Sequence, residues 1–231
     1  MKYGKRQHIY SSFLLLTFPL LAVCTGSIKQ NDAVNISISH PVQTPPQTYV
    51  YECSDGYNFT LRIEGENAWL FRSTQTISLP HVPSGSGTKF SDGSTTYWSK
   101  GDEALLEVGK ETYRGCKNNR AKAIWEDAKL RGIGFRAVGN EPGWYLEINE
   151  NEKIVFINNY GENQYEFTTP EPLIDQLSRT TKYEVQDDTH ELTITLKGKR
   201  CHDSMSDESF ETAVTVIFDG KYFTGCGKAL H

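Results

Sequence analysis

The stretch SGSGTKFSDGSTTYWSKGDEALLEV, residues 84–108, has the pattern that decides the fold. Two short runs of β-branched, aromatic and aliphatic residues, Thr95–Ser99 and Ala104–Val108, are separated by the turn dipeptide Gly101-Asp102, and the turn dipeptide Asp92-Gly93 precedes the first run. Short strands that follow one another with turns between them are typical of small antiparallel barrels and sandwiches. This stretch therefore predicts antiparallel β-structure.

The same pattern continues on both sides of this stretch. Apolar and polar residues alternate from Tyr57 to Ile63, in Trp144–Ile148, in Leu192–Leu196 and in Val214–Phe218, as expected for strands with one buried face. We therefore expect an all-β protein with a first β domain at residues 48–118 and a second antiparallel β-rich domain at residues 133–231.

Two segments depart from the strand pattern. Arg120–Leu130 is rich in alanine and other good helix formers and is followed by Gly132, so residues 119–132 predict a linker with a short helix. The proline-containing segment Thr169–Leu177 predicts a turn or a single helical turn.

The first 24 residues have the pattern of an export signal. A basic start with Lys2, Lys5 and Arg6 precedes the apolar run Ser12–Val23, which is too short to span a membrane. Leu21-Ala22-Val23-Cys24 resembles a lipobox, so we expect Cys24 to carry a lipid anchor. Because Thr25 replaces the aspartate of an inner-membrane retention signal, we expect an outer-membrane lipoprotein that faces the periplasm.

Val23 departs from the lipobox pattern, which prefers a small residue before the cysteine, so cleavage to a soluble periplasmic protein is the alternative. Residues 25–47 are polar, contain three prolines and show no periodicity, and they predict a flexible tether.

The chain has five cysteines, an odd number. If Cys24 carries lipid, four remain for disulfides in an oxidising compartment, and four cysteines allow three pairings. The pairing of neighbours, Cys53 with Cys116 and Cys201 with Cys226, places one bridge in each half. The chain has no Cys-x-x-Cys or His-x-x-x-His spacing, so we expect no metal site and no cofactor.

Charge excludes some partners. The formal net charge of the 231 residues is −5, so bulk attraction to nucleic acid or to anionic lipid is not expected. Residues 51–118 carry nine acids and seven bases, and residues 132–231 carry 17 acids and nine bases. Both halves are therefore acidic and compatible with a basic protein partner.

Residues 51–116 resemble the membrane-bound and periplasmic inhibitors of c-type lysozyme, the MliC/PliC family. The resemblance rests on Tyr51-Glu52-Cys53, on Ser86-Gly87-x-x-Phe90-Ser91-Asp92-Gly93, on Trp98-Ser99-Lys100-Gly101-Asp102-Glu103-Ala104 and on Cys116, in this order. It implies an eight-stranded antiparallel β-barrel tied by a disulfide, a c-type lysozyme as partner, and no enzymatic activity.

The resemblance also implies which residues bind lysozyme. A serine and a lysine of this family enter the active-site cleft and contact the two catalytic carboxylates, and the matching positions are Ser86 and Lys100. Gly87 belongs to the same narrow loop. Phe90 stands where the family usually has tyrosine, so one hydroxyl is missing. From the local sequence alone, an ordinary surface lysine is the default interpretation of Lys100, and the ordered combination of motifs between two cysteines reverses it.

The second half resembles an uncharacterised family of bacterial envelope domains, through Phe135–Trp144 and the segments around Cys201 and Cys226. That resemblance implies no activity. Arg136, Glu141 and Trp144 are compatible either with a ligand site or with a buried ion pair and a core aromatic. Two functions other than inhibition stay open: a non-inhibitory envelope protein that binds peptidoglycan or another ligand, and an enzyme with its site around Glu141, His202 and Asp203.

Overall fold

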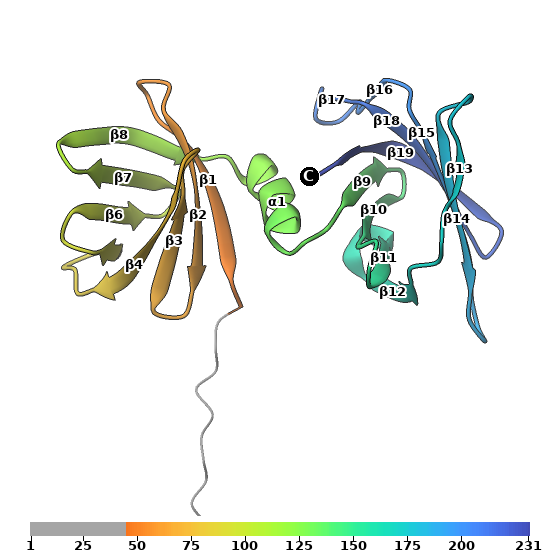
Figure 1. Cartoon of the computed structure of the whole chain (residues 1–231), viewed down its shortest axis with the longest axis horizontal. Coiled ribbons are helices and arrows are strands. Elements are labelled where there is room, and N and C mark those ends of the chain that lie inside the picture. Colours follow the sequence, from red (N-terminus) through yellow and green to blue (C-terminus); the bar gives the residue numbers. More distant parts are fainter. Residues whose placement is uncertain (1–44) are drawn as a thin grey trace, which may run out of the picture. The chain divides into compact units, whose positions relative to one another are not determined.

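A computed structural model of the chain describes residues 45–231. It is an all-β structure with one α-helix among the described residues (Figure 1). The predicted export signal, Cys24 and nearly all of the predicted tether lie outside the described residues. No helix within residues 45–231 is long and apolar enough to cross a membrane.

The first eight strands form a closed antiparallel barrel in which each strand pairs with the next along the chain (Figure 1). The barrel closes where β1 pairs with β8, with Tyr51 opposite Asn118 and Glu52 opposite Lys117. An eight-stranded barrel is confirmed. Its strands are β1 (Gln47–Glu52), β2 (Asn58–Glu64), β3 (Asn67–Phe71), β4 (Thr76–Val82), β5 (Thr88–Ser91), β6 (Thr95–Lys100), β7 (Glu103–Val108) and β8 (Glu111–Asn118).

The barrel core follows from the period of two along each strand, which points alternate side chains inward. Phe59 and Leu61 of β2 are buried, and Thr60 between them is half-buried. Tyr51 and Tyr97 share a hydrogen bond of 2.7 Å between their hydroxyls inside the barrel, so both buried polar groups are satisfied. Burial raises the pKa of Tyr51 to about 12 and also raises the pKa of Tyr97.

Helix α1 (Arg120–Leu130) has the predicted bounds. The side chain of Asn119 caps its first turn by accepting a hydrogen bond from the backbone N–H of Lys122. The chain leaves the helix through Gly132, whose φ of +81° favours glycine. Two buried residues of the helix, Trp125 and Ala128, form a small apolar cluster with Phe210, Cys226 and Leu230.

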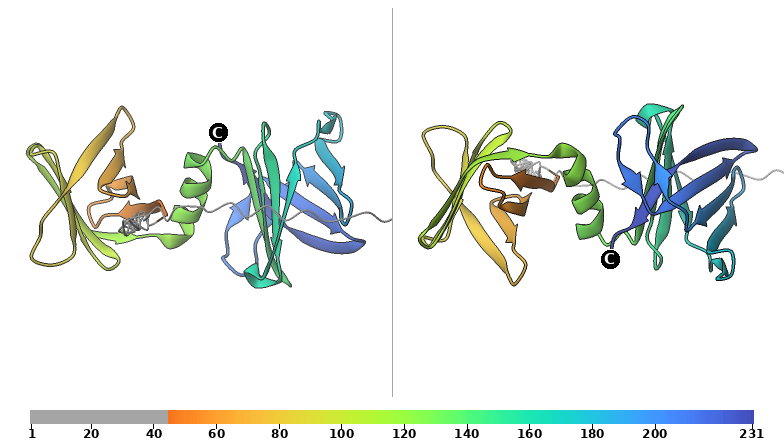
Figure 2. Two further views of the ribbon diagram at one scale, coloured as in Figure 1. Left: turned by 90° about the horizontal axis from the view of Figure 1, so that it is seen from below. Right: turned by 90° about the horizontal axis from the view of Figure 1, so that it is seen from above.

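The remaining chain forms a nine-stranded antiparallel sheet in the order β12-β11-β10-β9-β19-β18-β15-β14-β13, and β16 and β17 form a separate two-stranded sheet. The larger sheet curls so that β12 approaches β14. Figure 2 gives two further views of the barrel, the helix and this sheet. The strands are β9 (Phe135–Asn140), β10 (Gly143–Ile148), β11 (Lys153–Asn158), β12 (Asn163–Thr168), β13 (Leu173–Asp175), β14 (Thr180–Gln186), β15 (Glu191–Lys197), β16 (Cys201–His202), β17 (Ser209–Phe210), β18 (Thr212–Phe218) and β19 (Lys221–Ala229).

The core of this curled sheet contains Trp144, Phe156, Ile194 and Val216, contributed by four different strands. A single 3-10 turn, Asn159–Gly161, joins β11 to β12. The expectation of a turn or helical turn over Thr169–Leu177 is wrong for its centre, because Leu173–Asp175 is a strand that pairs with β14. Pairing with a neighbouring strand has overridden the local proline signal.

Two disulfides tie the strands together. Cys53 is bonded to Cys116 across 63 residues in the barrel. Cys201 of β16 is bonded to Cys226 of β19, so the two-stranded sheet is fastened to the larger one. Bridges that close loops of these lengths contribute about 2–4 kcal/mol each to the free energy of unfolding.

Candidate functional site

The loop between β4 and β5 carries Ser86 and is held in a narrow shape. The hydroxyl of Ser84 donates to the carbonyl oxygens of Ser86 (3.2 Å) and Gly87 (2.9 Å). Gly87 has a φ of +70°, and a Cβ at this position would lie 2.1 Å from the backbone oxygen of Ser99. The loop therefore packs directly on β6, and only glycine fits at residue 87.

Trp98 joins this loop to the strand that carries Lys100. The indole Nε1–H of Trp98 donates a hydrogen bond of 2.8 Å to the carbonyl oxygen of Ser86. Trp98 and Lys100 are two residues apart on β6, so both side chains point away from the barrel core on the same face. Ser86, Trp98 and Lys100 are all exposed, and we call these three residues the barrel patch.

Beside the barrel patch lies a shallow cavity of about 290 Å³. Trp98 and Lys100 line it together with Glu103, Ala104 and Leu105. Trp98 was named above as a motif residue without a role in binding. Its contact with Ser86 could not be predicted, because it depends on where the loop lies in three dimensions. A cation beside an exposed aromatic ring and a serine hydroxyl can contact carboxylate groups of a partner.

Other residues of the two motifs build the barrel. Phe90 is 2% exposed; it packs with Tyr97 in the barrel core and against the exposed ring of His81. The carboxylate of Asp92 accepts hydrogen bonds from the backbone N–H groups of Ser94 (2.8 Å) and Thr95 (2.6 Å), which closes the turn between β5 and β6. These hydrogen bonds lower the pKa of Asp92, and the one from the backbone of Thr95 has the largest effect. The structure thus places Ser86 and Lys100 at the surface and Phe90 inside.

In the second half, Arg136 and Trp144 are both buried, as in one of the two interpretations open from the sequence. The partner of Arg136 is Glu147, which lies directly opposite on β10, and not Glu141. The sequence analysis missed Glu147. The signal was present: a two-residue turn at Glu141-Pro142 pairs residue 140 with 143 and so brings residue 136 opposite 147.

Glu141, His202 and Asp203 line a common cavity of about 460 Å³. The carboxylate of Asp203 accepts hydrogen bonds from Ser206 (2.5 Å), from the backbone of Met205 (3.2 Å) and from Asn140. His202 points outward and pairs with Asp207 at 3.1 Å. Asp203 therefore holds the loop that follows it and does not orient His202, as a catalytic acid–base pair would require.

Within residues 45–231, no group of three or more His, Cys, Asp or Glu side chains is placed to hold a metal ion. The two sequence motifs meet at the exposed barrel patch, where Trp98 donates to the carbonyl oxygen of Ser86.

Residues 51–114 match the family model described as the membrane-bound lysozyme-inhibitor of c-type lysozyme. The matched segment contains Ser86, Trp98 and Lys100 and ends before the helix. No curated protein and no solved structure matches the chain.

Proposed function

We propose that this chain inhibits c-type lysozyme by inserting Ser86 and Lys100 into the active-site cleft of that enzyme. The observation that carries the proposal is the barrel patch, which lies inside the segment that matches the inhibitor family. The patch is exposed, its loop is anchored to β6 by Trp98, and its lysine points away from the barrel.

The chemistry of lysozyme explains why a lysine would inhibit it. Lysozyme keeps one carboxylic acid protonated in an apolar pocket, as general acid, and a second carboxylate ionised. An ammonium group close to these two groups favours their ionised forms and so lowers the pKa of the general acid. Lys100 would thus remove the catalytic proton as well as block the sugar, while the hydroxyl of Ser86 can donate to or accept from either carboxyl group.

The two other predicted contact residues have supporting roles in this proposal. Gly87 allows the loop to pack on Ser99, as its φ and its missing side chain require. Phe90 belongs to β5 and is buried in the barrel core, so it supports the strand that follows the loop and does not itself reach the partner. The negative net charge of the barrel favours association with a basic enzyme.

The experiment compares inhibition of a c-type lysozyme by the parent chain and by Lys100→Ala. Loss of a desolvated interfacial ion pair costs about 2–5 kcal/mol, so the inhibition constant should rise at least about 30-fold. Lys110→Ala is the matched control, because Lys110 is an exposed lysine in the turn between β7 and β8. Equal inhibition by Lys100→Ala and Lys110→Ala would refute the role of Lys100.

The alternative proposal is an envelope-binding protein that does not inhibit lysozyme. It predicts retention of the folded chain on isolated peptidoglycan and no effect on lysozyme turnover. Inhibition by the parent chain without retention on peptidoglycan would exclude this alternative.

The proposed location follows from the N-terminal sequence. With Cys24 lipidated, the chain would be held at the outer membrane facing the periplasm, where it could protect the cell wall; cleavage without lipidation would give a soluble periplasmic protein. Labelling with a radioactive fatty acid distinguishes the two, since the label should enter the parent chain and be absent from Cys24→Ser.

A further inference from the structure

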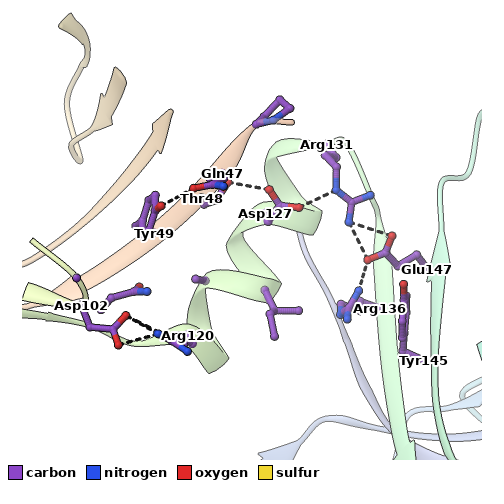
Figure 3. A pocket seen from close by; sticks show the side chains of 15 residues that line it. Gln47, Thr48, Tyr49, Asp102, Arg120, Asp127, Arg131, Arg136, Tyr145 and Glu147 are labelled. Atoms are coloured by element: carbon purple, nitrogen blue, oxygen red, sulfur yellow. Dashed lines mark hydrogen bonds and ion pairs between the residues drawn. The ribbon is translucent and has the colours of Figure 1, made fainter. Parts of the chain in front are cut away.

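A second cavity, of about 800 Å³, has no role in the proposed inhibition. Its lining includes Tyr49 of β1, Arg131 at the end of α1, Arg136 of β9, and Tyr145 and Glu147 of β10 (Figure 3). We call it the Arg136 pocket. Its volume lies within the range of roughly 300–1,000 Å³ that is usual for small-molecule sites.

Arg136 is buried in the wall of this pocket without a full set of hydrogen-bond partners. Only 7% of the residue is exposed. Its Nη1 donates to Glu147, and its Nε has no partner. A guanidinium has five N–H donors, and a buried donor without a partner is costly, because it has lost its water and gained nothing in exchange. Nε itself has almost no accessible surface, so an acceptor that enters the pocket would bind at the terminal nitrogens of the guanidinium, where only Nη1 has a protein partner.

The carboxylate next to Arg136 is shared. Glu147 also accepts hydrogen bonds of 2.8 and 3.0 Å from Nη2 of Arg131, so two guanidinium groups share one carboxylate (Figure 3). Arg131 has a second acid, Asp127, at 2.8 Å, but Asp127 in turn pairs with Arg62 at 2.9 Å. Arg136 is thus the end of a chain of alternating charges, and its own charge is only partly balanced.

Aromatic rings hold the guanidinium of Arg136 in place. Its Cζ lies 4.6 Å from the ring centroid of Tyr145 and 5.6 Å from that of Trp125. Burial lowers the pKa of Arg136, with Glu147 opposing this effect, yet an arginine stays protonated at neutral pH. A planar cation that is fixed by rings is preorganised to bind a planar anion through two parallel hydrogen bonds.

We propose that the Arg136 pocket binds a small organic carboxylate. A carboxylate carries a single charge and matches the planar guanidinium, so it would give Arg136 a second acceptor beside the carboxylate that it shares with Arg131. A phosphate with nearly two negative charges would be repelled by Glu147 and Asp127 about twice as strongly as a singly charged carboxylate. Ile124 and Ala123 of α1, which also line the pocket, offer an apolar surface to the uncharged part of the ligand.

The first experiment is calorimetric titration of the full chain with two carboxylates of different origin, N-acetylmuramic acid and N-acetylphenylalanine. Their uncharged counterparts, N-acetylglucosamine and N-acetylphenylalanine amide, and inorganic phosphate are titrated in parallel. At least one carboxylate should bind saturably, and at least about tenfold more tightly than its uncharged counterpart and than phosphate. The carboxylate that binds shows whether the source is a sugar acid or an acylated amino acid.

Arg136→Gln should weaken carboxylate binding at least about tenfold, whereas Arg200→Gln, at an exposed arginine of the same domain, should leave it unchanged. Ile124 gives a test that does not disturb the core, because it is 51% exposed on α1 and lines the pocket. Ile124→Glu should weaken binding by repulsion, and Ile124→Gln should not.

The proposal is overturned if neither carboxylate binds, if phosphate or an uncharged counterpart binds as tightly, or if Ile124→Glu and Ile124→Gln bind equally. Inhibition of lysozyme by the same variants is measured separately and should not change, since none of these residues belongs to the barrel patch.

Discussion

Lys100 and Arg136 are both cations on antiparallel strands, but the two regions that contain them use charge in opposite ways. Lys100 is exposed on the barrel, beside an exposed tryptophan. Arg136 is buried in the second sheet, opposite a carboxylate that is 4% exposed. A charge at the surface keeps its water until a partner arrives, whereas a buried charge has already lost its water and must be balanced inside the fold. We therefore expect changes at the barrel patch to alter binding and changes around Arg136 to alter stability.

The largest expected effect on stability comes from Glu147→Ala. This change leaves Arg136 without its carboxylate, and breaking a buried ion pair in this way typically costs about 3–5 kcal/mol of the free energy of unfolding. Glu184→Ala removes one partner of the exposed pair with Lys182 on β14 and should cost less than about 1 kcal/mol. Urea unfolding of both variants measures the difference, and similar losses would show that Arg136 is balanced without Glu147.

Gly87→Ala should weaken inhibition while the barrel stays folded. The φ of +70° and the 2.1 Å approach to the Ser99 oxygen force the loop out of its position, at a cost of about 1–3 kcal/mol. Gly85→Ala is the control, because Gly85 has no atom within 4 Å of an added Cβ. The inhibition constants of the two variants decide the matter, and a smaller loss for Gly87→Ala than for Gly85→Ala would contradict the described loop.

A smaller effect is expected for Trp98→Phe. The phenyl ring keeps most of the apolar surface but loses the Nε1–H that donates to Ser86, so inhibition should weaken by about 1 kcal/mol. Trp69→Phe, at another exposed tryptophan of the barrel, should have no effect on inhibition. If Trp98→Phe inhibits as well as the parent chain, the loop does not depend on this hydrogen bond.

The smallest effect is expected for Phe90→Tyr, which restores the tyrosine usual in the lysozyme-inhibitor family. Because the ring is buried, the new hydroxyl acts through the packing of the barrel and not by touching the partner. Inhibition should stay equal or become tighter by about 0.5 kcal/mol, the lower end of the value of one hydrogen bond. A clear loss of inhibition, with unfolding measured in parallel, would show that the interior near His81 has no room for the hydroxyl.

Much of the fold could be predicted from the sequence, because the relevant signals are local. Alternation over Tyr57–Ile63 predicts a strand, and the structure has β2 at Asn58–Glu64. Arg120–Leu130 combines helix formers with a following glycine, and the helix has these bounds. Ser86 and Lys100 could be selected only through the resemblance to a family, since serine in a turn and lysine after a strand are common.

Local signals suffice to predict the all-β class, the succession of short strands and the position of the helix, because alternation and turn residues act over a few neighbours. The contact of Trp98 with Ser86, the burial of Phe90 and the pairing of Arg136 with Glu147 are visible only in the folded chain. Each of these depends on which strand lies beside which and in what register, and the free energy that selects that arrangement comes from burial across the whole barrel or sheet rather than from any one segment.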